Sequence, residues 1–268
     1  MNVALRLQSY GVEVSMVSSV GDDKEGNKII NYLGNSGVNT DGIQISPNYG
    51  TGQVNVVLND KGVASYDIAY PVAWDKILPR KYYESQLKIS DIFIYGSLAC
   101  RDNTSRTTLK QLLHFAQYKV FDVNLRAPHY TKELLLELMQ PANFVKFNDD
   151  ELYEVAGYLG SKYNSMEQTI AFVAEKTQTE TICVTKGAYG AVLYHQKIFY
   201  YNSGYRIKVL DTVGSGDSFL ASVIYKLFSG EGPQAAINFG CAVGAMVAKS
   251  EGANPIFTMQ KISRFMNP

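Results

Sequence analysis

Short apolar runs alternate with helical patterns along most of this chain, and this alternation limits the folds that it can adopt. Strand-like runs occur at residues 91–95, 119–122, 144–147 and 182–184. Helical patterns separate them near 103–117, near 131–139, from 149 onward and before 176. Parallel strands need long crossover connections, usually helices, that cover both faces of a sheet. The pattern therefore predicts an α/β fold with a mostly parallel central sheet.

Two segments interrupt this alternation. Residues 53–68 contain two extended runs around Asn59-Asp-Lys-Gly62, and residues 191–201 contain two around His195-Gln196. Extended runs on either side of a short turn predict β-hairpins, and the first is a candidate lid. The sequence shows no repeat, low-complexity tract or linker, so we expect residues 1–268 to form a single domain.

The C-terminal part carries two consecutive helical patterns. Apolar residues recur at three and four positions from Phe219 to Phe228, which gives that helix one apolar face. Ser229-Gly230 ends it, and Pro233 opens the next helix at its first turn. Because this next helix is rich in alanine and glycine, we expect it to pack closely against a neighbour.

Composition argues against several classes of protein. Lys and Arg together number 25, as do Asp and Glu, so the formal net charge is zero. A nucleic-acid or membrane partner would favour a basic face, so we expect neither. The few, widely spaced cysteines lead us to expect a cytoplasmic protein, with Cys183 and Cys241 in its core. The apolar run at 241–248 is too short to span a bilayer.

The most informative segment is Asp211-Thr-Val-Gly-Ser-Gly-Asp217, directly before an amphipathic helix. Gly214 and Gly216 let the backbone turn so that several N–H groups point at one place. The helix start adds unpaired N–H groups and the positive end of its dipole, which together suit an anion. Asp217 either caps the helix or accepts a proton from an attacking hydroxyl group.

Other glycine-rich motifs fit this chain less well. A dinucleotide-binding fingerprint needs a third glycine three positions after Gly216, where Phe219 stands. A Walker A loop has the right spacing from Gly21 to Gly26, but Asn27 replaces its lysine. We therefore predict a surface turn that leads into a helix there. No G-x-S-x-G or H-E-x-x-H sequence supports a hydrolase.

The segment from Asp211 to Asp217 resembles the C-terminal signature of the ribokinase/PfkB carbohydrate kinases, usually D-T-x-G-A-G-D. Ser215 replaces the common alanine. The resemblance implies a three-layer α/β/α ribokinase-like fold with a small β-lid, and it implies that Asp217 is the catalytic base. It also implies an anion hole and a nucleotide contact, formed by Gly214, Ser215, Gly216 and Thr212.

Segments nearer the N-terminus resemble the same family in the expected order. Asn2-Val-Ala4 resembles the end of a G-G-x-x-x-N-x-A signature, which implies that Asn2 contacts the sugar. Gly21-Asp22 resembles the family's G-x-D turn, and we expect lid elements around 12–20 and 48–74. The family's first strand and Gly-Gly pair precede this Asn. We therefore expect an N-terminally incomplete domain that lacks a central strand, or a mis-assigned start, with the phosphate loop intact.

Two further segments resemble substrate-binding parts of the family. Asp122-Val-Asn-Leu-Arg126 resembles a D-x-N-x-R strand end, which implies that Asn124 and Arg126 bind the sugar and phosphates. Arginine can hold phosphate oxygens in a bidentate fork, and the alternative is a surface salt bridge. Gly96-Ser-Leu-Ala-Cys-Arg101 resembles bacterial fructokinases, which makes Arg101 a candidate sugar ligand; the alternative is a solvated arginine.

Two other segments resemble the family's nucleotide site. Asn148-Asp-Asp-Glu151 resembles an N-x-x-E motif, which implies that Asn148 contacts the nucleotide and that Glu151 acts on Mg²⁺ through water. The alternative is a plain capping pair. Thr185-Lys-Gly-Ala-Tyr-Gly190 resembles a T-x-G-x-x-G segment beside the nucleotide, which implies contacts from Thr185, Gly187 and Gly190. The two glycines could equally be turn residues of the hairpin.

The family resemblance implies an ATP-dependent transfer of phosphate to a small sugar, with Mg²⁺ and a monovalent cation near Asp211. The fructokinase-like segments predict the conversion of fructose to fructose 6-phosphate. Two alternatives stay open: a kinase for another sugar, a sugar acid or a nucleoside, and a non-catalytic protein that binds sugar or nucleotide. We also expect a homodimer formed through the lid.

Overall fold

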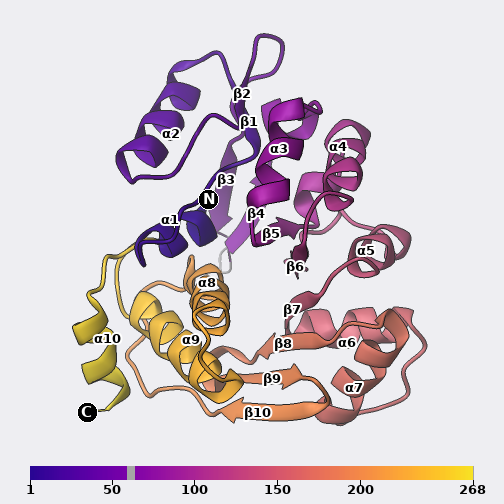
Figure 1. Ribbon diagram of the computed structural model, residues 1–268, viewed down its shortest axis with the longest axis vertical. Coiled ribbons are helices and arrows are strands. Elements are labelled where there is room, and N and C mark those ends of the chain that lie inside the picture. The colour runs from indigo at the N-terminus through magenta and orange to yellow at the C-terminus, as the bar shows by residue number, and fades with distance from the viewer. Residues whose placement is uncertain (59–63, 268) are drawn as a thin grey trace. The chain divides into compact units, whose positions relative to one another are not determined.

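The computed structural model describes residues 1–58 and 64–267, with side chains outside 55–66 (Figure 1). The chain divides into two compact units. Unit 1 contains Met1–Glu13, Ile92–Leu98 and Tyr118–Pro268. Unit 2 contains Val14–Asp91 and Ala99–Gln117. That residues 1–268 form a single domain stays a prediction.

Unit 1 is built on a six-stranded sheet in the order β10-β9-β8-β7-β6-β5 (Figure 1). Its parallel strands are β5 (Ile92–Gly96), β6 (Tyr118–Asp122), β7 (Phe144–Asn148) and β8 (Thr181–Thr185). An antiparallel hairpin completes the sheet, formed by β9 (Ala191–His195) and β10 (Ile198–Asn202). The predicted mostly parallel sheet and its hairpin are confirmed.

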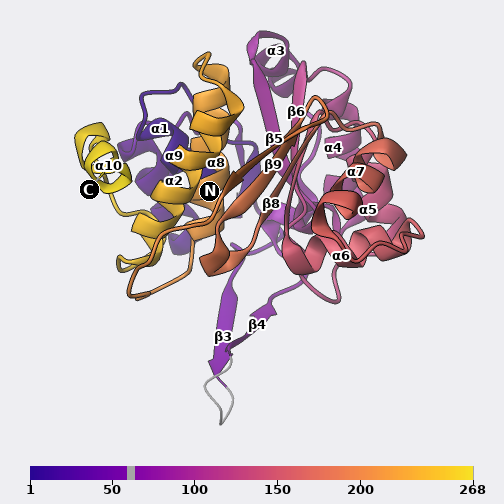
Figure 2. The same ribbon diagram turned by 90° about the horizontal axis from the view of Figure 1, so that it is seen from below.

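Helices cover both faces of this sheet (Figure 2). One face carries α8 (Ser215–Phe228) and α9 (Pro233–Ala248), which pack against each other. The other face carries α5 (Lys132–Met139), α6 (Asp149–Tyr158) and α7 (Met166–Thr177). On the outside, α1 (Asn2–Gln8) packs on α8, and α10 (Met259–Met266) packs on α9. Unit 1 therefore has the predicted three layers.

The apolar face of α8 packs against both the sheet and α9. Its buried members include Phe219, Leu220, Val223 and Ile224, which belong to one core cluster with sheet residues such as Phe144. Close contact with α9 depends on small residues there, as predicted. A Cβ added at Gly240 would lie only 2.5 Å from a methyl carbon of Val223, so a larger residue would force the helices apart.

Unit 2 contains two small sheets and three α-helices in its described residues. One sheet pairs β1 (Ser18–Gly21) with β2 (Ile43–Ser46) in parallel, and the other pairs β3 (Val54–Leu58) with β4 (Ala64–Ile68) in an antiparallel hairpin. The helices are α2 (Lys24–Asn35), α3 (Lys81–Ile89) and α4 (Asn103–Leu113), with the short 3₁₀ turn η1 (Ala73–Lys76). A second 3₁₀ turn, η2 (Leu98–Cys100), begins at the last residue of a unit 1 segment and ends in unit 2. The predicted hairpin is confirmed, its role as a lid stays a prediction, and its turn at 59–62 lies outside the described residues.

Helix α4 is shorter than the sequence predicted. The helical pattern extended to residue 117, but α4 ends at Leu113. The N–H groups of His114 and Phe115 bond the carbonyl oxygens of Gln111 and Leu112, three residues back. Such bonds tighten the last turn and end the α-helical ladder.

The remaining predictions about composition concern thiols and membrane spans. The cysteines Cys100, Cys183 and Cys241 are free and buried, and burial raises the pKa of Cys100 to about 12. The two predicted core cysteines are therefore core residues. In the part of the chain that the structure describes, no helix has the length and apolar character needed to cross a membrane.

Candidate active site

The segment from 211 to 217 enters α8 through a glycine that no other residue can replace without strain. Gly214 is the N-cap residue, with a φ of +76°. A Cβ at this position would lie 2.6 Å from the carbonyl oxygen of Ala253. Both the positive φ and the close approach explain the glycine.

Hydrogen bonds within the loop shape the entrance of α8. Asp211 Oδ1 accepts from the N–H of Val213 at 2.9 Å, and the carbonyl of Thr212 accepts from the N–H of Ser215 at 3.2 Å. The Ser215 hydroxyl donates to the carbonyl of Gly244 on α9 at 3.0 Å. The first N–H groups of a helix have no partner within it, so this entrance can bind an anion.

Asp217 is the third residue of α8, and its carboxylate is bonded to Asn2 from α1. Asn2 Nδ2 donates to Asp217 Oδ2 at 2.8 Å, across 215 positions of sequence. The N-cap position belongs to Gly214 and no side chain caps the helix, so the alternative that Asp217 is a cap is wrong. The structure thus brings together two residues that the sequence predicted at opposite ends of the chain.

A buried lysine that no sequence motif indicated lies beside this entrance. Lys146 Nζ on β7 is 3.1 Å from Asp122 Oδ1, and the two side chains are 8% and 10% exposed. A Cβ added at Gly216 would lie 3.6 Å from the same Nζ, so the ammonium group adjoins the first turn of α8. The sequence does contain an indication of this pair, because a lysine stands inside the apolar run at 144–147. A lysine buried in a strand needs a partner of opposite charge.

Three carboxylates act on the ammonium group of Lys146 through their negative charge. Burial lowers the pKa of Lys146, but Asp122, Glu151 and Asp217 outweigh burial and raise it above its ordinary value. Burial also raises the pKa of Asp122; Asp217 and Glu151 add to this rise, and Lys146 opposes it. The raised pKa of Lys146 thus follows from the carboxylates around one ammonium group, and the raised pKa of Asp122 follows mainly from burial. Lys146 therefore stays protonated through the neutral range.

Asn148 and Glu151 form a reciprocal cap at the start of α6. Asn148 Oδ1 accepts from the N–H of Glu151, and Glu151 Oε2 accepts from the N–H of Asn148, both at 2.8 Å. Glu151 Oε1 also accepts from the N–H of Leu125 at 2.9 Å, which ties the segment after β6 to α6. The capping alternative is confirmed. Among the described residues no group of three or more His, Cys, Asp or Glu could hold a metal ion, and the role of Glu151 toward Mg²⁺ stays a prediction.

Asn124 and Arg126 lie in the segment that follows β6. Asn124 has a φ of +39°, which is uncommon for a residue other than glycine and is typical of functional or strained positions. Arg126 is exposed, and its Nη1 donates to the carbonyl of Leu125 at 2.7 Å. No ion pair of Arg126 occurs within the described residues, so the salt-bridge alternative finds no support there.

The segment from Thr185 to Gly190 forms a tight turn between β8 and β9. Thr185 Oγ1 donates to the carbonyl of Phe147 at 3.3 Å, and Gly187 and Gly190 have φ values of +54° and +79°. A Cβ at Gly190 would lie 2.0 Å from the carbonyl oxygen of Asn202. The turn-residue alternative is therefore confirmed for both glycines, and their contact with a nucleotide stays a prediction.

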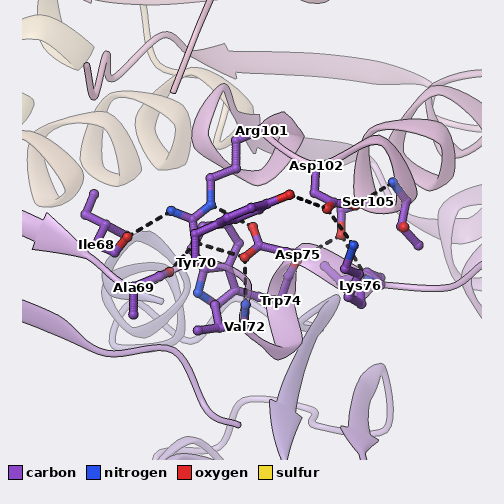
Figure 3. Close-up of polar contacts among 12 residues, drawn as sticks. Ile68, Ala69, Tyr70, Val72, Trp74, Asp75, Lys76, Arg101, Asp102 and Ser105 are labelled. Atoms are coloured by element: carbon purple, nitrogen blue, oxygen red, sulfur yellow. Dashed lines mark hydrogen bonds and ion pairs between the residues drawn. The ribbon is translucent and has the colours of Figure 1, made fainter. Parts of the chain in front are cut away.

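Arg101 belongs to unit 2, where a dense polar network surrounds it (Figure 3). Its Nε and Nη2 form a bidentate ion pair with Asp75 at 2.7 and 2.9 Å, and both side chains are at most 2% exposed. Its Nη1 and Nη2 also donate to the carbonyls of Ile68 and Ala69 at 3.2 and 2.5 Å. The guanidinium group lies 4.1 Å from the ring centre of Trp74. The alternative of a solvated arginine is wrong, and a sugar contact stays a prediction.

A second ion pair extends this network (Figure 3). Asp102 caps α4 through the N–H of Thr104 and accepts from Lys76 Nζ at 2.6 Å and from the Tyr70 hydroxyl at 2.9 Å. Burial alone would raise the pKa of Asp102, but the hydrogen bonds from Lys76, Thr104 and Tyr70 lower it to about 2. The segment between β4 and η1 is therefore fixed to the start of α4 by two acidic residues.

The fold and the loop at α8 define the class of protein: an α/β domain in which helix α8 begins at a glycine-rich entrance that suits an anion. The profile of the "pfkB family carbohydrate kinase" matches residues 1–259. The chain therefore belongs to the pfkB family of carbohydrate kinases, as the signature at 211–217 predicted.

Similar proteins include several fructokinases. "Fructokinase-2" of Solanum habrochaites is 25% identical over 95% of this chain and 81% of its own length. A "5-dehydro-2-deoxygluconokinase" of Listeria innocua is 24% identical over 94% and 80%. The crystal structure of a fructokinase with bound ATP from Xylella fastidiosa has a TM-score of 0.87, at 21% identity over 99% of this chain and 88% of that chain. This similarity confirms the ribokinase-like fold.

Proposed function

We propose that this carbohydrate kinase transfers the γ-phosphoryl group of ATP to fructose, giving fructose 6-phosphate, with Asp217 as the general base. One observation carries the proposal: Asp217 lies in the first turn of α8, beside N–H groups that suit an anion, and is bonded to Asn2. Relatives named fructokinase and the ATP-bound fructokinase structure support the acceptor and the donor.

In the proposed reaction the O6 hydroxyl of fructose gives its proton to the Asp217 carboxylate. The hydroxyl oxygen forms a bond to the γ-phosphorus, and the bond from that phosphorus to the bridging oxygen of ADP breaks in line. Negative charge spreads over the transferring group. This charge would be stabilised by the first-turn N–H groups of α8 and by the protonated Lys146. Both are already in position, so they need not move as the charge develops.

The residues present fit an Mg²⁺ ion held mainly by phosphates and water rather than by a protein cage. Glu151 has both carboxylate oxygens engaged by backbone N–H groups, and each oxygen keeps one acceptor position for water. When bound, Mg²⁺ would neutralise charge on the phosphates. Asp211 Oδ2, which accepts no hydrogen bond from a described residue, is the corresponding candidate for a monovalent cation.

The remaining site residues are assigned in the same proposal. Asn2, Asn124, Arg126 and Arg101 would bind the sugar and its product. The nucleotide would lie near Thr185, Gly187, Gly190, Asn148 and Thr212, close to α9. We also propose that the protein is cytoplasmic and forms a homodimer through the β3–β4 lid, which light scattering of the purified chain would test.

The experiment is ADP release with and without fructose, followed by NMR identification of the product. We expect fructose-dependent turnover and a phosphate on O6. Turnover that does not depend on fructose but depends on another sugar, a sugar acid or a nucleoside would favour the second candidate. The similarity to the 5-dehydro-2-deoxygluconokinase motivates that candidate. The chain could also bind ATP but phosphorylate none of these acceptors. That result would contradict the proposal of a kinase and favour a non-catalytic protein that binds sugar or nucleotide.

A further inference from the structure

Two asparagine side chains connect Asp217 to the segment that follows α9. Asn254 Nδ2 donates to Asn2 Oδ1 at 3.0 Å, and Asn2 Nδ2 donates to Asp217 Oδ2 at 2.8 Å. We propose that Asn254 is a positioning residue for Asp217 and that it acts through Asn2. This inference rests on the proposed role of Asp217 as the base.

The carboxylate fixes the direction of both hydrogen bonds. An ionised carboxylate only accepts, so Asn2 must turn its NH₂ group toward Asp217. The amide oxygen of Asn2 then faces Asn254, which must donate. Flipping either amide would place two acceptors or two donors against each other. The Asn2 side chain therefore has one orientation while Asn254 is in place.

The side-chain oxygen of Asn254 makes no comparable hydrogen bond to a described residue. Asn254 Oδ1 is buried and has no hydrogen-bond partner in the part of the chain that the structure describes. A buried acceptor without a partner destabilises a folded protein, and alanine at this position would remove that acceptor. The side chain is thus better explained by the contact that its NH₂ group makes than by a contribution to stability.

Arg6 holds together the two segments that carry the ends of this relay. It is 2% exposed, its Nε donates to Ser218 Oγ at 3.2 Å, and its Nη2 donates to the carbonyl of Pro255 at 2.8 Å. Ser218 directly follows Asp217, and Pro255 directly follows Asn254. The spacing between the base and Asn254 is therefore fixed by a buried arginine as well as by the amides.

The test is the variant Asn254→Ala, assayed with ATP and the sugar that the wild-type chain phosphorylates. We expect kcat to fall about tenfold to hundredfold with KM for ATP unchanged, because a small misplacement of a reacting group costs up to about 100-fold. Asn143→Ala is the control. Asn143 Oδ1 accepts from the N–H of Lys119 at 2.8 Å, just before β7 in unit 1, and does not bond Asp217, so we expect wild-type kcat.

A double-mutant cycle separates the relay from independent effects. If Asn254 acts through Asn2, the variant carrying both Asn2→Ala and Asn254→Ala has the kcat of Asn2→Ala alone. If the two residues act independently, the double variant loses kcat by the product of the two single losses, and this result would overturn the proposal. A wild-type kcat in Asn254→Ala would also overturn it. Asn254→Asp is the second variant. Its carboxylate cannot donate to Asn2 Oδ1, so it should lose kcat while keeping the shape of the side chain.

Asp217→Asn distinguishes this proposal from the proposed function. Full activity in Asp217→Asn would show that Asp217 is not the base, which would overturn the proposed function and the relay with it. An inactive Asp217→Asn together with an unaffected Asn254→Ala would leave the proposed function in place and reject only the positioning role of Asn254.

Discussion

At the scale of single residues, the buried pair of Lys146 and Asp122 has a large structural consequence. Both side chains are nearly inaccessible, and the ammonium group of the lysine also adjoins the first turn of α8. A buried charge is tolerated only with a partner, so removing one member leaves the other uncompensated. The same lysine thus contributes to the stability of unit 1 and to the charge of the candidate site.

We predict that Lys146→Met lowers the free energy of unfolding by about 3–5 kcal/mol, the usual effect of breaking a buried ion pair. Urea unfolding at neutral pH measures this, with the exposed Lys28→Met as a matched control. Adding Asp122→Asn to Lys146→Met should recover part of the loss, because no unpaired charge remains. A loss equal to that of the control would show that the pair does not stabilise the fold.

At the scale of elements, Arg101 fixes the end of the β3–β4 hairpin. It bonds the carbonyls of Ile68 and Ala69 at the end of β4, and it pairs with Asp75 in η1 (Figure 3). The planar guanidinium fork matches the carboxylate and also stacks on Trp74. These contacts explain how a two-stranded hairpin, which is marginal by itself, is held in unit 2.

We predict that Arg101→Lys destabilises the protein by about 1–3 kcal/mol, because an ammonium group cannot reproduce the fork and leaves buried acceptors unpaired. Arg80→Lys, at an exposed arginine before α3, is the control. Thermal or urea unfolding measures the difference. Unchanged stability combined with a raised KM for the sugar would instead assign Arg101 to ligand binding.

At the scale of the whole molecule, the order of strands and helices was predictable because hydrophobic periodicity is local. The runs that became β5 to β8, and the apolar face of α8, depend on neighbouring residues only. The division into two units and the pairing of β1 with β2 depend on contacts between distant segments. No local pattern contains that information.

The candidate site divides in the same way. Gly214 and Asp217 were predictable because a glycine-rich turn and a helix start occupy consecutive residues. Lys146 and Asn254 were not singled out, because each acquires its role from partners far away in sequence. An isolated lysine or asparagine carries no motif, although a lysine inside an apolar strand could have been recognised as needing a partner.

The proposed reaction depends on Asp217 as the group that removes the proton from the sugar. The most direct measurement is sugar-dependent ADP release by Asp217→Asn, beside Asp41→Asn at an exposed position of unit 2. Asparagine keeps the size of the side chain but cannot take the proton. We predict that kcat falls by about 10²–10⁴-fold while ATP still binds, as expected for the loss of a general base. Wild-type turnover in Asp217→Asn would show that Asp217 is not the general base.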